Sequence, residues 1–152
     1  MTTAEESIEV DVYVAAAYNQ WTQFEDFPRF MEHVEEVRQI DDRHLHWKAK
    51  IAGVQREFDT EITEQIPDAR IAWRSTEGTA HAGVVDFHKL DRSSTRVTLQ
   101  MDMEPEGLAE TAADKLGIVR RQVRKDLQSF KELIESRGHP TGAWRGDVPR
   151  EG

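Results

Sequence analysis

The chain of 152 residues contains no cysteine, which excludes disulfide bonds, thiol catalysis and cysteine-bound zinc. It has no apolar run of the roughly 20 residues that a membrane-spanning helix requires, so no insertion into a membrane is expected. Its nine glycines form neither a phosphate-binding loop nor a dinucleotide-binding fingerprint, and no Ser-His-Asp triad order is present. The sequence therefore predicts no cofactor.

Positive charge is also scarce, because 20 Lys and Arg face 29 Asp and Glu, giving a net charge of −9 and a pI near 5.1. An acidic surface repels phosphate backbones and anionic head groups, so binding to nucleic acid or to anionic membranes is not expected. The densest basic run, from Arg120 to Lys125, has helical spacing and is interpreted as a solvated helix face. The polar, acidic segment Met1–Ser7 lacks the features of a signal peptide, which favours a cytoplasmic location.

The residues that are present suffice for one hydrophobic core. Hydrophobic residues make up 38% of the chain and include four Trp and six Phe. A chain of this length is the usual size of a single domain, and it can bury enough apolar surface to fold. The composition therefore predicts one folded domain.

Seven stretches alternate between apolar and polar residues, which is the pattern of a strand with one buried face. In residues 7–14, for example, Ile8, Val10 and Val12 share one face and polar residues occupy the other. Short turn signals separate these stretches, and this arrangement indicates an antiparallel meander. The predicted strands are residues 7–14, 34–40, 44–51, 55–66, 71–75, 80–90 and 97–103.

Three segments carry helical spacing instead. Residues 15–21 suit a short helix, and a second short helix is predicted to begin near Asp26, with Pro28 in its first turn. A long helix is predicted to end at about Arg137, because Gly138 follows. Its apolar residues step by three and four and form one stripe, which requires a facing surface. These residues are Leu116, Val119, Val123, Leu127, Phe130 and Ile134.

The order of strand, two short helices, six strands and long helix predicts an α+β fold. The helices are expected on one side of a curved antiparallel sheet, with the long C-terminal helix in its hollow. Residues 1–6 are expected to form a polar N-terminal segment, residues 7–137 the domain, and residues 138–152 a flexible tail. Trp144 in this tail is a candidate anchor on the domain.

Several segments carry a resemblance to a known family, and the most specific is the Phe-Pro-Arg-Phe-Met block. The long C-terminal helix is one of these segments. The others are Ile8–Val14, Ala16–Trp21, Phe24–Met31, Val34–Val37 and Ile71–Ser75. From about residue 7 to 137 the chain resembles the START-like (SRPBCC) superfamily, in particular its polyketide cyclase/dehydrase and lipid-transport branch. The resemblance implies a helix-grip fold in which seven strands curl around the last helix and leave a cavity for a hydrophobic molecule. It transfers no catalytic residue, because the family has no universal catalytic motif.

Strand alternation and helix phase indicate which side chains would line such a cavity. The short helices would contribute residues at its mouth, and the strands and the long helix would contribute its walls. Each of these residues also fits an ordinary core, which is the commoner role. The predicted lining residues are Phe27, Phe30, Met31, Trp47, Ile51, Phe58, Ile62, Trp73, Phe87, Leu99, Met101, Val119, Val123 and Leu127.

Polar residues near these positions are the candidates for chemistry. Arg56 and Thr60 share the strand face of Phe58, and His81 shares that of Phe87. A histidine in an apolar pocket can acquire a shifted pKa and act as an acid or a base. The candidates for catalysis are His81, Arg56, Arg74 and Thr60.

Three further histidines are interpreted as surface residues. His44 and His46 lie two residues apart on the polar face of a strand, beside Lys48, so a solvated face is favoured over a metal site. His88 falls on the polar side of its strand unless Gly83 introduces a bulge. The sequence predicts no metal.

Three functions fit these features. The leading hypothesis is a protein that binds or carries a hydrophobic small molecule, either a lipid or a polyketide-like compound. The alternative is a polyketide aromatase/cyclase or dehydratase that acts on a poly-β-keto chain in the same cavity. The third is an interaction module that engages a protein partner through its acidic surface or the tail around Trp144. The sequence sets no oligomeric state.

Overall fold

The computed structural model describes residues 2–51, 54–78, 81–103 and 112–137. Within these ranges the chain forms seven strands, two α-helices and one 3₁₀ helix, labelled η1, and this order confirms the predicted α+β arrangement. In chain order the elements are β1 (Thr2–Val10), α1 (Val14–Trp21), η1 (Phe24–Arg29), β2 (Val34–Gln39), β3 (His44–Ile51), β4 (Val54–Ile66), β5 (Arg70–Gly78), β6 (His81–Asp91), β7 (Ser94–Met103) and α2 (Ala112–Arg137).

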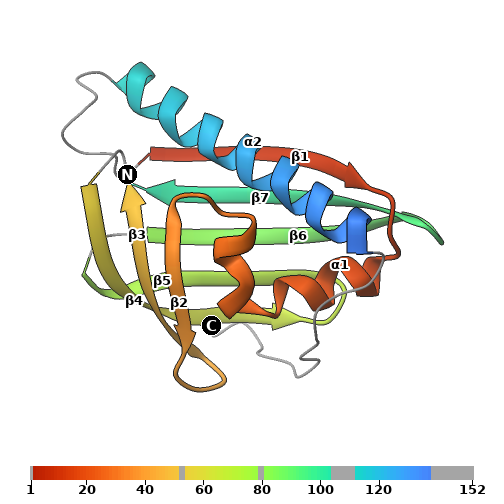
Figure 1. Cartoon of the computed structure of the whole chain (residues 1–152), viewed down its shortest axis with the longest axis horizontal. Helices are drawn as coiled ribbons and strands as arrows, with labels where there is room; N and C mark the ends of the chain where they lie inside the picture. The colour runs from red at the N-terminus through yellow and green to blue at the C-terminus, as the bar shows by residue number, and fades with distance from the viewer. Residues whose placement is uncertain (1, 52–53, 79–80, 104–111, 138–152) are drawn as a thin grey trace.

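The strands form one antiparallel sheet in the order β1-β7-β6-β5-β4-β3-β2. Each strand from β2 to β7 pairs with its neighbour in the chain, and β1 pairs with β7, so the first and last strands lie side by side. The sheet is strongly curled, since β2 and β3 run across the direction of β6 and β7 (Figure 1). Register shifts between β2 and β3 and between β4 and β5 accompany the curl, because a bulge bends a strand and increases its twist.

The first strand is longer at its N-terminal end than the alternation indicated. β1 begins at Thr2, so nearly all of the expected polar N-terminal segment belongs to the sheet. Ala4 is the buried residue of this extension, and Glu5 beside it is exposed. An edge strand pairs through its backbone and keeps one face in water, so a largely polar sequence fits. The strand ends at Val10, and Val14, expected in the strand, begins α1 instead.

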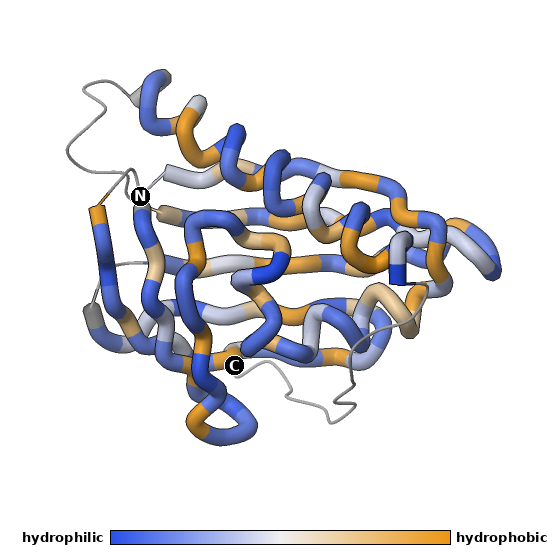
Figure 2. Tube along the Cα trace, in the orientation of Figure 1, coloured by the Kyte–Doolittle hydropathy of each residue, from blue (hydrophilic) through white to orange (hydrophobic). Residues whose placement is uncertain are grey.

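The helices cover the concave face of the sheet (Figure 1). α2 packs along β1 and β7, whereas α1 contacts β6 and β7. The predicted apolar stripe of α2 is confirmed, because its members from Val119 to Ile134 are at most 2% exposed and Leu116 is half-buried. Figure 2 shows hydrophobic and hydrophilic segments alternating along this helix. Burial of each such side chain contributes about 1.5–3 kcal/mol before the entropy of ordering is subtracted.

One bulge decides which polar residues of β4 face the interior. Strict alternation from Phe58 would bury Glu64. The register between β4 and β5 shifts between Ile62 and Glu64, so one extra residue is accommodated on β4. As a result Gln65 is buried, at 1% exposure, and Glu64 lies on the convex face.

β6 keeps its alternation through Gly83. The register shift between β6 and β7 lies at the far end of the strand, so His81 and Phe87 are buried and His88 is exposed. Gly83 pairs with Trp73 of β5, and a Cβ atom at this position would overlap the six-membered ring of the indole. Glycine is therefore required here for the close approach of a side chain.

Neither α1 nor α2, as far as the structure describes them, combines the length and apolar character needed to cross a bilayer. The predicted tail, residues 138–152 with Trp144, lies outside the described residues. Its proposed contact with a protein partner remains a prediction from the sequence.

Candidate functional site

Four aromatic side chains pack together between the sheet and η1. Alternation places Trp47 of β3, Phe58 of β4 and Trp73 of β5 on the concave face, and each is at most 2% exposed. Trp47 stacks on Phe58 and on Trp73, with ring centroids 5.6 and 5.9 Å apart. The ring of Phe27 from η1 lies 5.5 Å from that of Trp47. These four residues, here called the aromatic group, stabilise the core and are the kind of surface that lines apolar ligand sites.

His81 of β6 lies against the aromatic group and is 1% exposed. Its imidazole stacks on Phe58 at a centroid distance of 4.8 Å, and Trp73 Nε1–H donates a long hydrogen bond of 3.4 Å to His81 Nδ1. This bond places the ring proton on Nε2. Burial lowers the pKa of His81 to about 3, because a charge is unfavourable in apolar surroundings. At neutral pH His81 is therefore uncharged and has one N–H donor.

Thr60 of β4 orients one ring of the aromatic group. Trp47 Nε1–H donates a hydrogen bond of 2.8 Å to Thr60 Oγ1, and both residues are fully buried. A buried indole N–H normally has a hydrogen-bond acceptor, and here the neighbouring strand β4 supplies it. Thr60 thus has a structural role, because its hydroxyl group holds the indole of Trp47 in place.

Replacing Thr60 with valine should lower the free energy of unfolding by about 1–3 kcal/mol, because the buried Trp47 N–H loses its acceptor while the side-chain shape is retained. Thr98→Val is the matched control, since Thr98 shares its hydrogen bond with Ser7 at an exposed position. Its expected effect is below about 0.5 kcal/mol. Urea denaturation measures both variants, and equal losses would contradict a specific role for the buried bond.

Two more titratable residues are buried where α2 passes the turn between η1 and β2. His33 lies in this turn at 8% exposure, and Asp126 of α2 is fully buried. His33 Nδ1 is 3.8 Å from Asp126 Oδ1, which is too far for a hydrogen bond. Asp126 Oδ1 accepts a hydrogen bond of 2.9 Å from Gln122 Nε2, but among the described residues Oδ2 and both ring nitrogens of His33 have none. Buried polar atoms normally have partners, so these three atoms mark a place for a polar group of a ligand or a water molecule.

Burial disfavours the charged form of both members of this pair. Burial lowers the pKa of His33 to about 4, and the nearby Glu32 acts weakly in the opposite direction. Burial raises the pKa of Asp126 well above its ordinary value, although the hydrogen bond from Gln122 acts to lower it. Lys125 and Glu32 form an ion pair of 2.7 Å beside the two residues. The interior therefore contains an imidazole that burial keeps neutral at neutral pH, next to a carboxyl group whose ionisation burial disfavours, and such a pair can serve as base and acid.

The two buried histidines belong to one electrostatic environment. After burial itself, the second cause that lowers the pKa of His81 is the charge that His33 would carry. Protonation of one imidazole therefore disfavours protonation of the other. The aromatic group, His81 and the His33–Asp126 pair together form the candidate functional site.

Three of the four residues predicted for catalysis lie on the concave side. His81 and Thr60 are buried at the aromatic group, as described above. Arg56 is half-buried on the same face of β4, toward the start of the strand. Their catalytic roles remain predictions.

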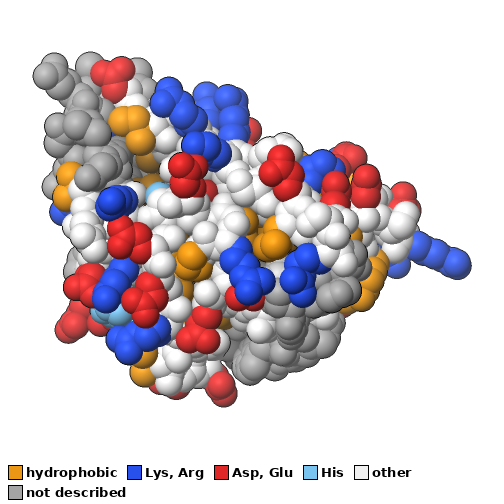
Figure 3. Space-filling model, viewed as in Figure 1, with side chains coloured by type: hydrophobic (Ala, Val, Ile, Leu, Met, Phe, Trp, Pro, Cys, Tyr) orange, Lys and Arg blue, Asp and Glu red, His pale blue; other side chains and the backbone are white. Residues whose placement is uncertain are grey.

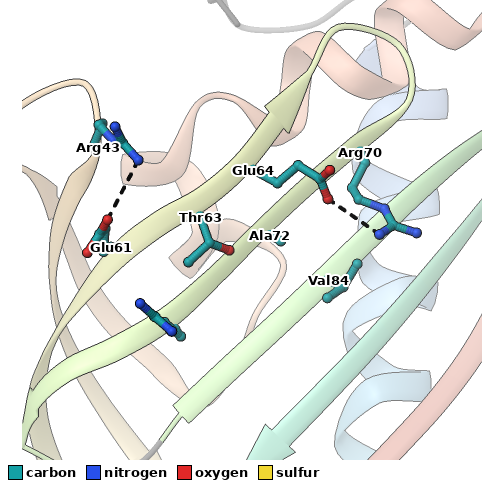
Figure 4. Close-up of a pocket in the computed structure, with 8 residues that line it drawn as sticks. Arg43, Glu61, Thr63, Glu64, Arg70, Ala72 and Val84 are labelled. Carbon is teal, nitrogen blue, oxygen red and sulfur yellow. Dashed lines mark hydrogen bonds and ion pairs between the residues drawn. The ribbon is translucent and has the colours of Figure 1, made fainter. Parts of the chain in front are cut away.

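Arg74, the fourth candidate, lies on the opposite face of β5 from the aromatic group. It is exposed and lines a pocket of about 340 Å³ on the convex side of the sheet. In this pocket Arg43 points to Glu61 and Arg70 points to Glu64, at distances of 3.7 and 3.4 Å (Figure 4). The prediction that Arg74 acts in the interior is wrong, because alternation next to a buried tryptophan turns it outward.

The predicted lining residues occupy several parts of the interior. Four of them form the aromatic group around His81. Phe30 packs on Trp21 with ring centroids 5.1 Å apart, and Phe87 packs on Tyr18 of α1 at 5.5 Å. Ile51 ends β3, and its side chain lies outside the described residues. The remaining members, all buried, are Met31, Ile62, Leu99, Met101, Val119, Val123 and Leu127. Contact of this set with a ligand remains a prediction.

Sequence reasoning missed His33 and Asp126. His33 lies in a turn, where no periodicity separates buried from exposed positions. Asp126 carried a signal, because it follows Val123 by three residues and precedes Phe130 by four, which is the spacing of the buried stripe. A carboxyl group on an apolar helix face is costly to bury and is therefore a candidate functional group.

The histidines on the convex face are engaged with carboxylates. His46 Nδ1 lies 2.6 Å from Asp59 Oδ1, and His44 Nδ1 lies 2.8 Å from Asp41 Oδ1. Within the described ranges, no group of three or more histidine, aspartate and glutamate side chains is arranged to hold a metal ion.

Comparison with known proteins places this geometry in context. The model of the family described as polyketide cyclase/dehydrase and lipid transport matches residues 10–132. An uncharacterized 17.2 kDa protein from the melC2-rnhH intergenic region of Streptomyces lincolnensis is 56% identical over 149 residues, which span 97% of this chain and 99% of the relative.

Solved structures share the architecture at low sequence identity. A START superfamily protein from Mycobacterium smegmatis is 13% identical with a TM-score of 0.79, over 90% of this chain and 99% of that protein. The Zhui aromatase/cyclase from a Streptomyces species is 16% identical with a TM-score of 0.72, over 93% of this chain and 98% of that protein. At these identities the likeness establishes the fold.

Proposed function

Because the chain belongs to the polyketide cyclase/dehydrase and lipid-transport family, we propose that it binds a hydrophobic small molecule between the curled sheet and α2. The START-like helix-grip fold that the sequence resemblance implied is confirmed. The observation that supports the proposal most directly is the His33–Asp126 pair, because Asp126 Oδ2 and both ring nitrogens of His33 are buried and have no hydrogen-bond partner among the described residues.

The chemistry of the interior defines the ligand class. The aromatic group favours flat or unsaturated apolar molecules, which pack on ring faces and edges. Burial disfavours the charged forms of His33, His81 and Asp126, so this interior favours a neutral hydrogen-bonding group, such as a carbonyl or a hydroxyl, over a charged one. A lipid or a polyketide-like compound that carries such a group meets both conditions.

Ligand binding can be tested by native mass spectrometry and by thermal melts with a panel of lipids and aromatic polyketides. A ligand at 100 times its Kd should stabilise the protein by about 2.7 kcal/mol. Asp126→Leu should weaken binding of ligands with a carbonyl or hydroxyl group by about tenfold, because a buried hydrogen bond is lost. Glu132→Leu, at an exposed position of the same helix, should leave the affinity unchanged. A panel in which no compound binds or stabilises the protein would contradict the proposal.

A second candidate function is supported by the buried imidazole of His33 and the buried carboxyl group of Asp126, whose Nδ1 and Oδ1 atoms lie 3.8 Å apart. In cyclisation of a poly-β-keto chain, a base removes a proton from a methylene between two carbonyls, and the resulting carbanion attacks a further carbonyl. An acid then protonates the new alkoxide, and loss of water completes the dehydration. Asp126 is suited to donate the proton and His33 to accept one, with His81, Thr60 and Arg56 as further candidates. Asp126→Asn would separate the two functions, because a carrier keeps its ligand affinity and a cyclase loses turnover.

A further inference from the structure

A groove of about 530 Å³ lies between β1 and α2, and its lining residues belong to these two elements. Its apolar part is formed by Ile8 of β1 and Leu127 of α2, and Arg121, Arg124 and Lys125 line it as well. Figure 3 shows Lys and Arg side chains gathered over α2 on this side of the molecule. The groove thus combines an apolar floor with a basic rim.

The basic rim is not fully neutralised. Arg124 Nε lies 3.0 Å from Glu6, and Lys125 pairs with Glu32 at 2.7 Å. Arg121 is exposed and forms no ion pair with any residue that the structure describes. The lining therefore carries three cations and one carboxylate, on a protein whose net charge is −9. A local excess of positive charge on an acidic protein favours an anionic ligand at this place.

We propose that this groove binds an amphiphile with an anionic head group, either a carboxylate or a phosphate. The head group pairs with Arg121, whose planar guanidinium matches both anions in a two-point hydrogen bond. The apolar chain lies on Ile8 and Leu127. The charged rim of this site is formed by residues that do not line the interior, and Leu127 is the residue that the groove shares with the predicted lining of the interior, so the groove provides a second place for a ligand.

Other occupants fit the groove less well. An amphipathic helix of a partner protein needs a larger apolar surface than the floor formed by Ile8 and Leu127. A membrane surface would be contacted through exposed apolar side chains, but the large exposed ones of the described chain, such as Ile40 and Leu90, lie outside β1 and α2. A simple inorganic anion would leave the apolar floor in water. The size of the groove falls in the range of small-molecule sites.

The proposal can be tested by NMR titration of the full chain with decanoate and with decyl phosphate, using decanol and inorganic phosphate as controls. Both decyl anions should shift the amide signals around Ile8 and Arg121 and should bind more tightly than either control. Arg121→Gln should raise the Kd by about tenfold, because a charged hydrogen bond is lost. Arg92→Gln removes the same charge at an exposed residue in the β6–β7 turn and should leave the Kd unchanged. The relative affinities of the two anions identify the head group.

Several results would overturn the proposal. Decanol that binds at the groove as tightly as decanoate would show that the rim has no role. Inorganic phosphate that binds as tightly as decyl phosphate would show that the apolar floor has no role. Shifts confined to the indole signals of Trp47 and Trp73 would assign the decyl compounds to the interior. An unchanged Kd in Arg121→Gln would exclude Arg121 as the anion contact.

Discussion

Replacing Gly83 with alanine should lower the free energy of unfolding by about 3 kcal/mol, a large loss for a single methyl group. The added Cβ atom would overlap the six-membered ring of Trp73. That ring cannot move away freely, because it stacks on Trp47 and its N–H bonds His81. The change therefore disturbs the packing of the whole aromatic group. Thermal and urea denaturation measure the loss.

Gly117→Ala is the matched control for this substitution. Gly117 lies on the exposed side of α2, and a Cβ atom there meets nothing within 4 Å. Alanine in a helix is more favourable than glycine by about 1 kcal/mol, so this variant should be more stable than the natural chain. A similar change in both variants would show that the contact between Gly83 and Trp73 does not determine the effect.

Replacing Asp126 with asparagine should make the stability of the protein more sensitive to acid. His33 and His81 have pKa values lowered to about 4 and 3, so between these values and 6.5 the unfolded state binds more protons. Each histidine therefore contributes stability that is lost as the pH falls, by about 1.4 kcal/mol per pH unit. Asp126 has the opposite effect on the pH dependence of stability. Because its pKa is raised on folding, the folded state binds a proton at this carboxyl group more readily than the unfolded state does. Its carboxyl group thus acts against the acid sensitivity that the two histidines cause.

Urea denaturation at about pH 4.5 and pH 5.5 would test this balance. Relative to the natural protein, Asp126→Asn should increase the loss of stability over this interval, and His81→Gln should decrease it by about 1.4 kcal/mol. Asp126→Asn should also be more stable than the natural protein at neutral pH, since it avoids the cost of a buried ionisable group. An unchanged pH dependence in both variants would show that these groups are not buried in solution.

Alternation and helical spacing predicted the order and nearly the full extent of the strands and helices, because one face of each element packs on a single core. They failed where pairing, and not burial, holds the backbone. Thr2 belongs to β1 through its pairing with β7, although the segment around it shows no apolar alternation. The bulge near Glu64 was equally invisible, because a register shift depends on the partner strand and leaves no mark in local periodicity.

The candidate site was predicted only in part, because local periodicity reports the face of a strand or helix but not its contacts with distant segments. Aromatic residues and His81 were placed correctly on the concave face, since strand parity fixes the side to which a residue points. The burial of His33 could not be predicted from strand parity, because it results from the contact between a turn and a helix far along the chain. Asp126 was within reach, since it lies on the stripe of α2 and is a costly residue to bury there. Natural proteins keep such destabilising groups where they serve a function, which supports its assignment to the site.

The pairing of β1 with β7 delays completion of the sheet during synthesis on the ribosome. The register joins Thr2 to Met103, so β1 emerges first and waits for its partner strand until nearly the whole domain has been translated. α2, which covers β1, is made later still. During this interval the nascent chain exposes the backbone edge of β1, and unpaired edges tend to associate with other chains. We expect chains that end before α2 to aggregate in the cell, and chaperones that shield the emerging N-terminal strand to raise the yield of folded protein.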